Sequence, residues 1–109
     1  MKVTITQVNT NIIAAVQGSI DSKTAPDLQQ AILPVISDTH KVILDLTEVT
    51  FVSSAGLRVL LMVYRQLKAK DGKVVLVGVS EEIKDVMFMT GFIAFFDICP
   101  SVEEALSSN

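Results

Sequence analysis

Two adjacent hydroxyl side chains, Ser53 and Ser54, are the residues whose position most suggests chemistry. They follow an apolar run, residues 42–46, and they precede an apolar stripe with helical spacing. The run is rich in β-branched residues, which is typical of a parallel strand buried on both faces. Residues 51–56 are then expected to turn the chain from this strand into a helix. In open α/β sheets, sites usually lie at that edge, outside the carboxyl ends of the strands.

The two serines have two interpretations. A serine at a helix start commonly accepts a hydrogen bond from a free backbone N–H, which stabilises the helix by about 1 kcal/mol. The alternative is a site for a partner or a modification, and the following helix favours it, because Arg58 is the only charged residue between positions 55 and 64. A helix that is apolar almost all round is either buried on two sides or offers a face to a partner. Its expected stripe is Leu57, Leu60, Leu61, Tyr64 and Leu67.

The chain lacks the residue sets that catalysis would need. His40 is the only histidine, and it precedes the central strand, at the opposite edge of the sheet from Ser54, so a Ser-His-acid relay is not expected. Neither G-x-S-x-G nor G-x-x-x-x-G-K-[ST] occurs. One cysteine and one histidine give no metal-binding spacing. Asp45 and Glu48 are more simply explained as solvated or capping acids. We therefore predict a protein that is not an enzyme and that uses no metal and no cofactor.

Composition indicates one globular domain. A chain of 109 residues is expected to build one core, so the predicted domain spans residues 1–109. No apolar stretch reaches the length of a membrane span, and no signal peptide is visible, so membrane insertion is not expected. The single Cys99 lies in an apolar run and is predicted to be a small buried hydrophobe, which fits a reducing cytoplasm. A net charge of −3 argues against nucleic-acid binding.

The hydrophobic pattern predicts the remaining elements in chain order. Two strands, one within residues 3–8 and one over 12–16, are joined by a hairpin turn at residues 9–11. A helix begins near Pro26, with Leu28, Ile32 and Val35 on one face, and Pro34 is expected to end or kink it. A strand over 74–79 leads to a helix capped by Ser80 with a stripe of Ile83, Val86 and Met87.

The last two elements complete the fold prediction. A strand over residues 95–99 is expected at a sheet edge because Pro100 follows it, and Ser101 caps a short final helix. The element order is then β-β-α-β-α-β-α-β-α. This order predicts an α/β fold, with a mixed sheet of four to five strands packed with four helices.

The segment D-L-T-E-V-T-F-V-S-S-A-G-L-R-V-L-L, residues 45–61, resembles the signature of the STAS domain, as found in bacterial anti-sigma factor antagonists. In that family a short loop carries a phosphorylatable serine beside small residues, followed by a G-L pair. The resemblance places the acceptor on Ser54, the small residue on Ala55 and the G-L pair on Gly56 and Leu57. Members of the family often have Asp just before the acceptor, whereas this chain has Ser53, which leaves open whether Ser53 replaces or joins Ser54 as acceptor.

A second stretch, residues 18–28, also resembles the family, which carries a strand ending in G-x-L-D and a helix starting with T-A-P here. Asp21 is the acid of this stretch. It is either a turn residue that caps its own backbone or a residue near the serine loop that assists phosphorylation or partner contact.

The resemblance implies a binding switch. The unphosphorylated domain would bind an anti-sigma factor, usually a serine kinase, and so free a sigma factor. Phosphorylation of Ser54 would end the binding, and a serine phosphatase would restore it. The implied partner surface consists of Asp21, Ser53, Ser54, Ala55, Gly56, Leu57, Arg58 and Leu61. We expect Gly56 to lie at the surface, where a partner approaches the backbone.

Two other functions stay open at this stage. STAS domains also resemble accessory subunits of lipid-transport ATPases, and a ligand-sensing module could use the strand ends as a pocket. The chain is also rich in large apolar groups near its end, and any exposed remainder of them is a candidate surface for a weak homodimer. These groups are Phe88, Met89, Phe92, Phe95 and Phe96.

Overall fold

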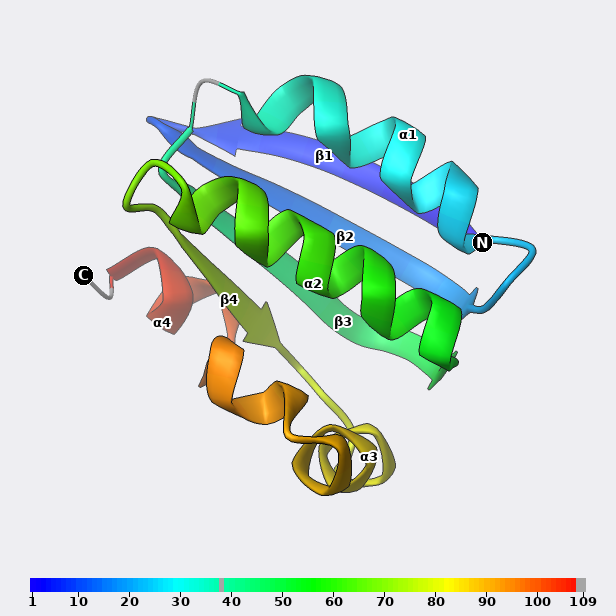
Figure 1. The fold of residues 1–109 in the computed structure, drawn as a ribbon. Helices are drawn as coiled ribbons and strands as arrows, with labels where there is room; N and C mark the ends of the chain where they lie inside the picture. The colour runs from blue at the N-terminus through cyan, green and yellow to red at the C-terminus, as the bar shows by residue number, and fades with distance from the viewer. Residues whose placement is uncertain (38, 108–109) are drawn as a thin grey trace.

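The computed structural model describes residues 1–37 and 39–107. They form one mixed sheet with strand order β1-β2-β3-β4-β5 and helices on both of its faces (Figure 1). The order β-β-α-β-α-β-α-β-α and the α/β class are those predicted, with one additional 3-10 helix, η1, before β5. The elements are β1 Lys2–Val8, β2 Asn11–Ile20, α1 Ala25–Ile36, β3 Lys41–Val52, α2 Ser54–Lys68, β4 Lys73–Val77, α3 Glu81–Thr90, η1 Phe92–Phe95, β5 Asp97–Cys99 and α4 Val102–Ser107.

The first two strands form the predicted hairpin. β1 pairs antiparallel with β2, and Val8 lies opposite Asn11 across the two-residue turn. Asn9 takes a left-handed conformation with φ of 56°, which asparagine tolerates better than most residues. The other neighbouring strand pairs are parallel, so the carboxyl ends of β2, β3, β4 and β5 all lie at one edge of the sheet.

Helices α1, α2 and α3 cover one face of the sheet, and α4 covers part of the other. Figure 1 shows α1 and α2 lying side by side across the first three strands. Alternate residues of β2 separate the two faces, since Ile12 and Ala14 pack under α1 and α2, whereas Ile13 packs with α4. The central strands β3 and β4 are buried on both faces, as their continuous apolar sequence predicts. In the described part of the chain, no helix is long and apolar enough to cross a membrane.

Both strands that lead to the candidate site are longer than their apolar cores. β3 was predicted over residues 42–46, but it continues to Val52. Its polar second half looks like a loop in the sequence, but it pairs with the second half of β2, which also continues to Ile20. Register shifts in this pairing keep the buried residues of β3, Val49 and Val52, directed toward the helices. The extra ladder fixes the end of β3 in space.

Two local predictions were wrong, and a third was wrong in part. Pro34 does not end α1, because the helix continues to Ile36, whose buried side chain holds the last turn against the core. The alternative expectation, a kink at Pro34, stays a prediction. The last strand does not begin at Phe95, since η1 occupies residues 92–95 and Phe96 is buried before β5 starts. Val86 does not belong to the buried stripe of α3, because its side chain is exposed.

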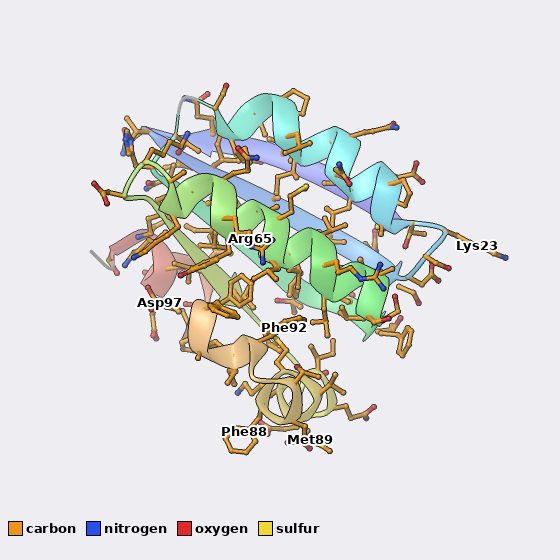
Figure 2. The ribbon with its side chains drawn as sticks, in the orientation of Figure 1. Lys23, Arg65, Phe88, Met89, Phe92 and Asp97 are labelled. Atoms are coloured by element: carbon orange, nitrogen blue, oxygen red, sulfur yellow. The ribbon has the colours of Figure 1, made fainter. Side chains whose placement is uncertain are left out.

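The aromatic end of the chain is partly core and partly surface. Phe96 is buried, and it packs edge-on against Tyr64 of α2, with ring centroids 5.8 Å apart. Phe88 and Met89 are 74% and 84% exposed, and Figure 2 shows both at the outer side of α3. Cys99 is half-buried rather than buried, and it packs with the residues beneath α4.

Candidate functional site

Ser53 is the N-cap of α2, and its polar groups are engaged in the turn. Its side-chain oxygen accepts the N–H of Gly56 at 3.3 Å, and its carbonyl accepts the N–H of Leu57 at 2.9 Å. Its own N–H donates to the carbonyl of Ile20 at 2.8 Å, which joins the end of β3 to the end of β2. The cap interpretation is therefore correct for Ser53. Its hydroxyl is directed into the turn.

Ser54 differs from its neighbour in its position, its exposure and its side-chain contacts. It is the first residue of α2, it is exposed, and its hydroxyl makes no hydrogen bond among the described residues. The first turn of α2 contains no acidic residue. Arg58, one turn further along, is also exposed and makes no ion pair within the described part of the chain. The positive end of the helix dipole is thus open to an anionic group.

Gly56 is buried, and the expectation that it lies at the surface was wrong. A Cβ at this position would lie 2.6 Å from the carbonyl oxygen of Ile20 and 2.9 Å from a methyl group of Val52. Glycine is needed here because the first turn of α2 packs directly on the ends of β2 and β3. Leu57 is 4% exposed, so it too is mainly a core residue. Gly56 and Leu57 were predicted as partner surface, but both instead pack beneath the turn and support it.

An apolar groove lies beside the turn, between the end of β3 and helix α3. It has a volume of about 160 Å³ and is lined by Thr50, Phe51, Val52, Leu57, Glu82, Ile83 and Val86. Phe51 and Val86 form its rim and are 54% and 44% exposed. Sequence reasoning missed both residues. The exposure of Phe51 could have been predicted only if β3 had been extended to Val52. Side chains alternate between the two faces of a strand, so Phe51 then points away from the core.

Asp21 serves the loop between β2 and α1. Its Oδ1 accepts the N–H of Lys23 at 2.9 Å and the N–H of Thr24 at 3.1 Å. These two backbone hydrogen bonds, first that of Thr24 and then that of Lys23, hold the pKa of Asp21 below its ordinary value. The turn-residue interpretation is therefore correct. Asp21 also follows Ile20, whose carbonyl binds Ser53, so its loop lies next to the serine turn.

The other predicted surface residues flank Ser54. Ala55 is half-buried and packs against the main core, and Leu61 is half-buried two turns along α2. Ser54, Arg58 and Leu61 therefore follow one another along the outer face of the helix.

Catalytic and metal chemistry find little support in the described residues. They contain no group of three or more His, Cys, Asp and Glu side chains that could hold a metal ion. His40 is exposed at the start of β3 and Ser54 follows its end, so the whole strand separates them.

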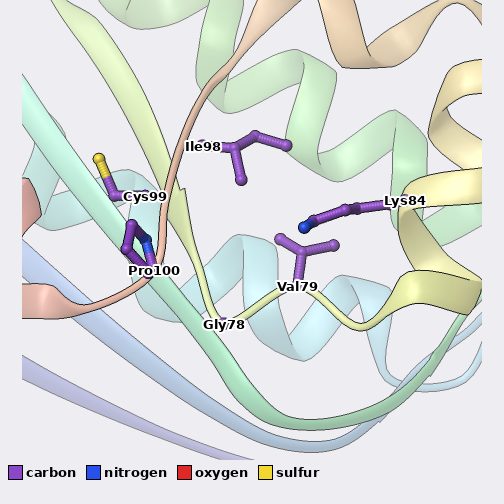
Figure 3. Close-up of a pocket in the computed structure, with 6 residues that line it drawn as sticks. All are labelled: Gly78, Val79, Lys84, Ile98, Cys99 and Pro100. Carbon is purple, nitrogen blue, oxygen red and sulfur yellow. The ribbon is translucent and has the colours of Figure 1, made fainter.

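A pocket at the carboxyl ends of β4 and β5 is where a sensed ligand could bind. Figure 3 shows its lining, which is Gly78, Val79, Lys84, Ile98, Cys99 and Pro100. Among the described residues of this lining, Lys84 alone is charged, and it forms an ion pair with Glu81 at 3.6 Å. The described lining offers no second charged side chain to orient a ligand.

The comparisons with known proteins agree with this geometry. The STAS domain family matches residues 2–105. A candidate anti-sigma factor antagonist of Bordetella bronchiseptica, BtrV, is 32% identical over 109 residues, which cover 99% of this chain and 94% of that protein. The crystal structure of an anti-sigma factor antagonist from Mycobacterium paratuberculosis has a TM-score of 0.86 at 29% identity, over 97% of this chain and 91% of the other.

The fold is also that of SpoIIAA, a Bacillus protein whose structure is known in two forms. The unphosphorylated and phosphorylated forms both have a TM-score of 0.77 and 19% identity to this chain. The similarity covers 96% of this chain and 94% and 96% of the two SpoIIAA chains. Because the family matches residues 2–105 and BtrV is similar over nearly its whole length, the chain belongs to the STAS domain family.

Proposed function

We propose that this protein is an anti-sigma factor antagonist whose partner binding is switched off by phosphorylation of Ser54. The unphosphorylated form binds an anti-sigma factor that is also a serine kinase, and this binding releases a sigma factor. A separate serine phosphatase restores the binding form. One observation carries the proposal: Ser54 presents an exposed hydroxyl, without a hydrogen bond among the described residues, at the start of a helix whose first turn has no acid. BtrV and the Mycobacterium paratuberculosis protein are both described as anti-sigma factor antagonists.

The geometry favours Ser54 over Ser53 as the acceptor. A kinase needs a hydroxyl that projects from the surface toward the transferred phosphoryl group. The Ser53 oxygen instead faces the Gly56 N–H inside the turn, and turning it outward would remove the cap. Ser54 can be modified without losing any hydrogen bond of the fold.

A phosphate on Ser54 should leave the domain folded. It carries a charge of about −1.5 to −2 and strong acceptor oxygens. At this position it meets the free N–H groups of the first turn and the positive end of the α2 dipole. Arg58 lies four residues along the same helix face and provides a cation for it. That SpoIIAA in both phosphorylation states resembles this fold equally is consistent with such a local effect.

The loss of binding then arises at the interface. The apolar groove rimmed by Phe51 and Val86 lies beside the serine turn, so a partner that covers Ser54 also covers apolar surface. Covering the phosphate and Arg58 with such a surface removes two charges from water, and this costs several kcal/mol per ion, which their attraction offsets only in part. That cost weakens binding by orders of magnitude. The domain itself contributes no catalysis in this scheme.

The test uses the cognate kinase, sought among the products of neighbouring genes. Incubation with kinase and ATP should add one phosphate, which fragment mass analysis should locate on Ser54. In titration calorimetry, Ser54→Ala should bind the anti-sigma factor and resist inactivation, whereas Ser54→Asp should bind poorly. Ser53→Ala is the matched control, which keeps the acceptor and loses the cap. Phosphate found on Ser53 alone, or full binding by Ser54→Asp, would refute the proposed switch.

A further inference from the structure

The outer edge of β1 carries backbone groups that no described residue satisfies. β1 is the border strand of the sheet (Figure 1). Val8 and Asn11 flank a two-residue turn, so they form a hydrogen-bonded pair, and bonded and non-bonded pairs alternate from there along the hairpin. The N–H and C=O groups of Val3, Ile5 and Gln7 therefore point away from β2, and none of them has a backbone partner elsewhere in the described chain.

This edge lacks the features with which proteins protect border strands. Such strands are usually short or bulged, or they carry prolines and charges. β1 has seven residues in unbroken register with β2, contains no proline, and has one charge, Lys2, at its end. The opposite border strand, β5, is protected: it has three residues, begins with Asp97 and is followed by Pro100.

The helix-facing side of β1 is also incompletely covered. A hollow of about 440 Å³ lies beside it under the end of α1, lined by Ile5, Gln7, Thr10, Ile12, Pro34, Val35 and Thr39. Val3 and Ile5 face this side and remain half-buried although both are apolar. A strand added at this edge would bury them further.

We propose that the edge binds a second copy of this chain, with the two β1 strands antiparallel about a twofold axis at Ile5. The two five-stranded sheets then become one continuous sheet. In this register Ile5 lies opposite Ile5 of the second copy, and Val3 lies opposite its Gln7. Every outward N–H and C=O of one strand thus meets an outward group of the other.

The side chains fit the same register. On the solvent face, Thr4 lies opposite Thr6 of the second copy, a favourable cross-strand pair. Lys2 lies opposite Val8, so no like charges face each other. A twofold interface places one patch against itself, and β1 is complementary to itself in hydrogen bonding and charge. This self-complementarity favours a second copy over an unrelated peptide.

The dimer leaves the serine turn accessible. Ser54 follows β3, which is separated from β1 by β2, so each dimer would present two switch sites. Dimerisation should therefore be insensitive to Ser54→Asp. If the protein did not dimerise, the proposed switch at Ser54 would not be affected.

Sedimentation equilibrium from micromolar to millimolar concentration tests the proposal. The apparent mass should rise from 11.8 kDa toward twice that value. Thr4→Lys combined with Thr6→Lys places like charges opposite each other across the axis and should raise the dissociation constant about tenfold or more. Thr4→Glu combined with Thr6→Lys is the matched control, because it places opposite charges in the same positions and should restore dimerisation. Both positions are exposed, so the melting temperatures should stay alike.

Hydrogen exchange locates the interface. The amides of Val3, Ile5 and Gln7 should exchange slowly in the dimer and freely in the monomer. Phe88→Ser combined with Met89→Ser should leave the dissociation constant unchanged, which separates β1 from the exposed end of α3. A monomeric mass at millimolar concentration would overturn the proposal and leave the edge to a different strand. Undiminished dimerisation of the double-lysine variant, or free exchange of these amides in the dimer, would also overturn it.

Discussion

Two of the strand-to-helix turns at the carboxyl edge of the sheet are built alike up to the cap. In the first, between β3 and α2, Ser53 accepts the N–H of Gly56 at 3.3 Å. In the second, before α3, Ser80 accepts the N–H of Ile83 at 3.2 Å. Both caps have extended backbone conformations, and both satisfy one of the free donors of a first turn.

The residues after the cap differ. α3 continues with Glu81 and Glu82, whose carboxylates compensate the positive end of its dipole. α2 continues with Ser54 and Ala55 and has no acid there. One helix thus carries a permanent negative charge at its start, and the other has an exposed hydroxyl where such a charge can be added. The cap is thus structural in both turns, and the residue that follows it makes the α2 turn the candidate for the proposed switch.

The largest effect expected from this comparison is at the third helical position, where α2 has Gly56 and α3 has Ile83. Gly56→Val should lower the free energy of unfolding by about 3 kcal/mol, because its side chain meets the Ile20 carbonyl and Val52. The melting temperature should then fall by roughly 10–20 °C. Ile83→Val, the matched change in α3, should cost about 1 kcal/mol. Equal melting temperatures for Gly56→Val and wild type would mean that the turn does not pack as described.

The caps themselves should give equal effects. Ser53→Ala and Ser80→Ala should each lower the free energy of unfolding by about 1 kcal/mol, since each removes one acceptor from a first turn. Urea denaturation of the two variants measures the difference. If Ser53→Ala cost several times as much as Ser80→Ala, the first turn would depend on Ser53 for more than its cap.

Adding a negative charge after the cap of α2 and removing one after the cap of α3 should change the free energy of unfolding in opposite directions. Ser54→Asp should raise the free energy of unfolding by about 0.5 kcal/mol, and Glu82→Gln should lower it by a similar amount. Both differences should shrink at high salt, because exposed charges are screened. A large loss of stability in Ser54→Asp would show that a charge at this position disrupts the fold, contrary to the proposed switch.

Asp21 provides the smallest effect, and it depends on pH. Its pKa in the folded chain lies below the ordinary value of 3.8, so its ionised form stabilises the fold above that value. This contribution is lost as the pH falls through the lowered folded pKa. Asp21→Asn keeps an acceptor oxygen but has no charge, so wild type should be the more stable at neutral pH. The difference should disappear in acid. If the stability difference between wild type and Asp21→Asn stayed constant down to strongly acidic pH, the charge of Asp21 would not contribute to the stability.

Local sequence signals were sufficient for much of this molecule. The apolar runs located β3 and β4, and Ser80, Gly91 and Pro26 act at the helix ends as their residue types predict. The serine turn was also predictable, because the cap, the small residues and the apolar helix are consecutive in the chain.

The features that were missed depend on residues far away in the chain. Gly56 is buried because Ile20, at the end of another strand, lies against it. The second half of β3 is a strand because β2 supplies a ladder for its polar residues. The groove beside the serine turn needs Phe51 and Val86 from separate elements. Hydrophobic periodicity reports which way a residue faces along its own element, and it carries no information on which elements meet.

The order of the strands has a consequence for how the chain folds during its synthesis. Because spatial order equals chain order, every strand pairs with the one made immediately before it. A growing chain leaving the ribosome can therefore add each new β-α unit to a sheet that is already present. No strand has to wait for a later segment to fill a gap between it and its neighbour. The molecule can be assembled in the direction in which it is translated.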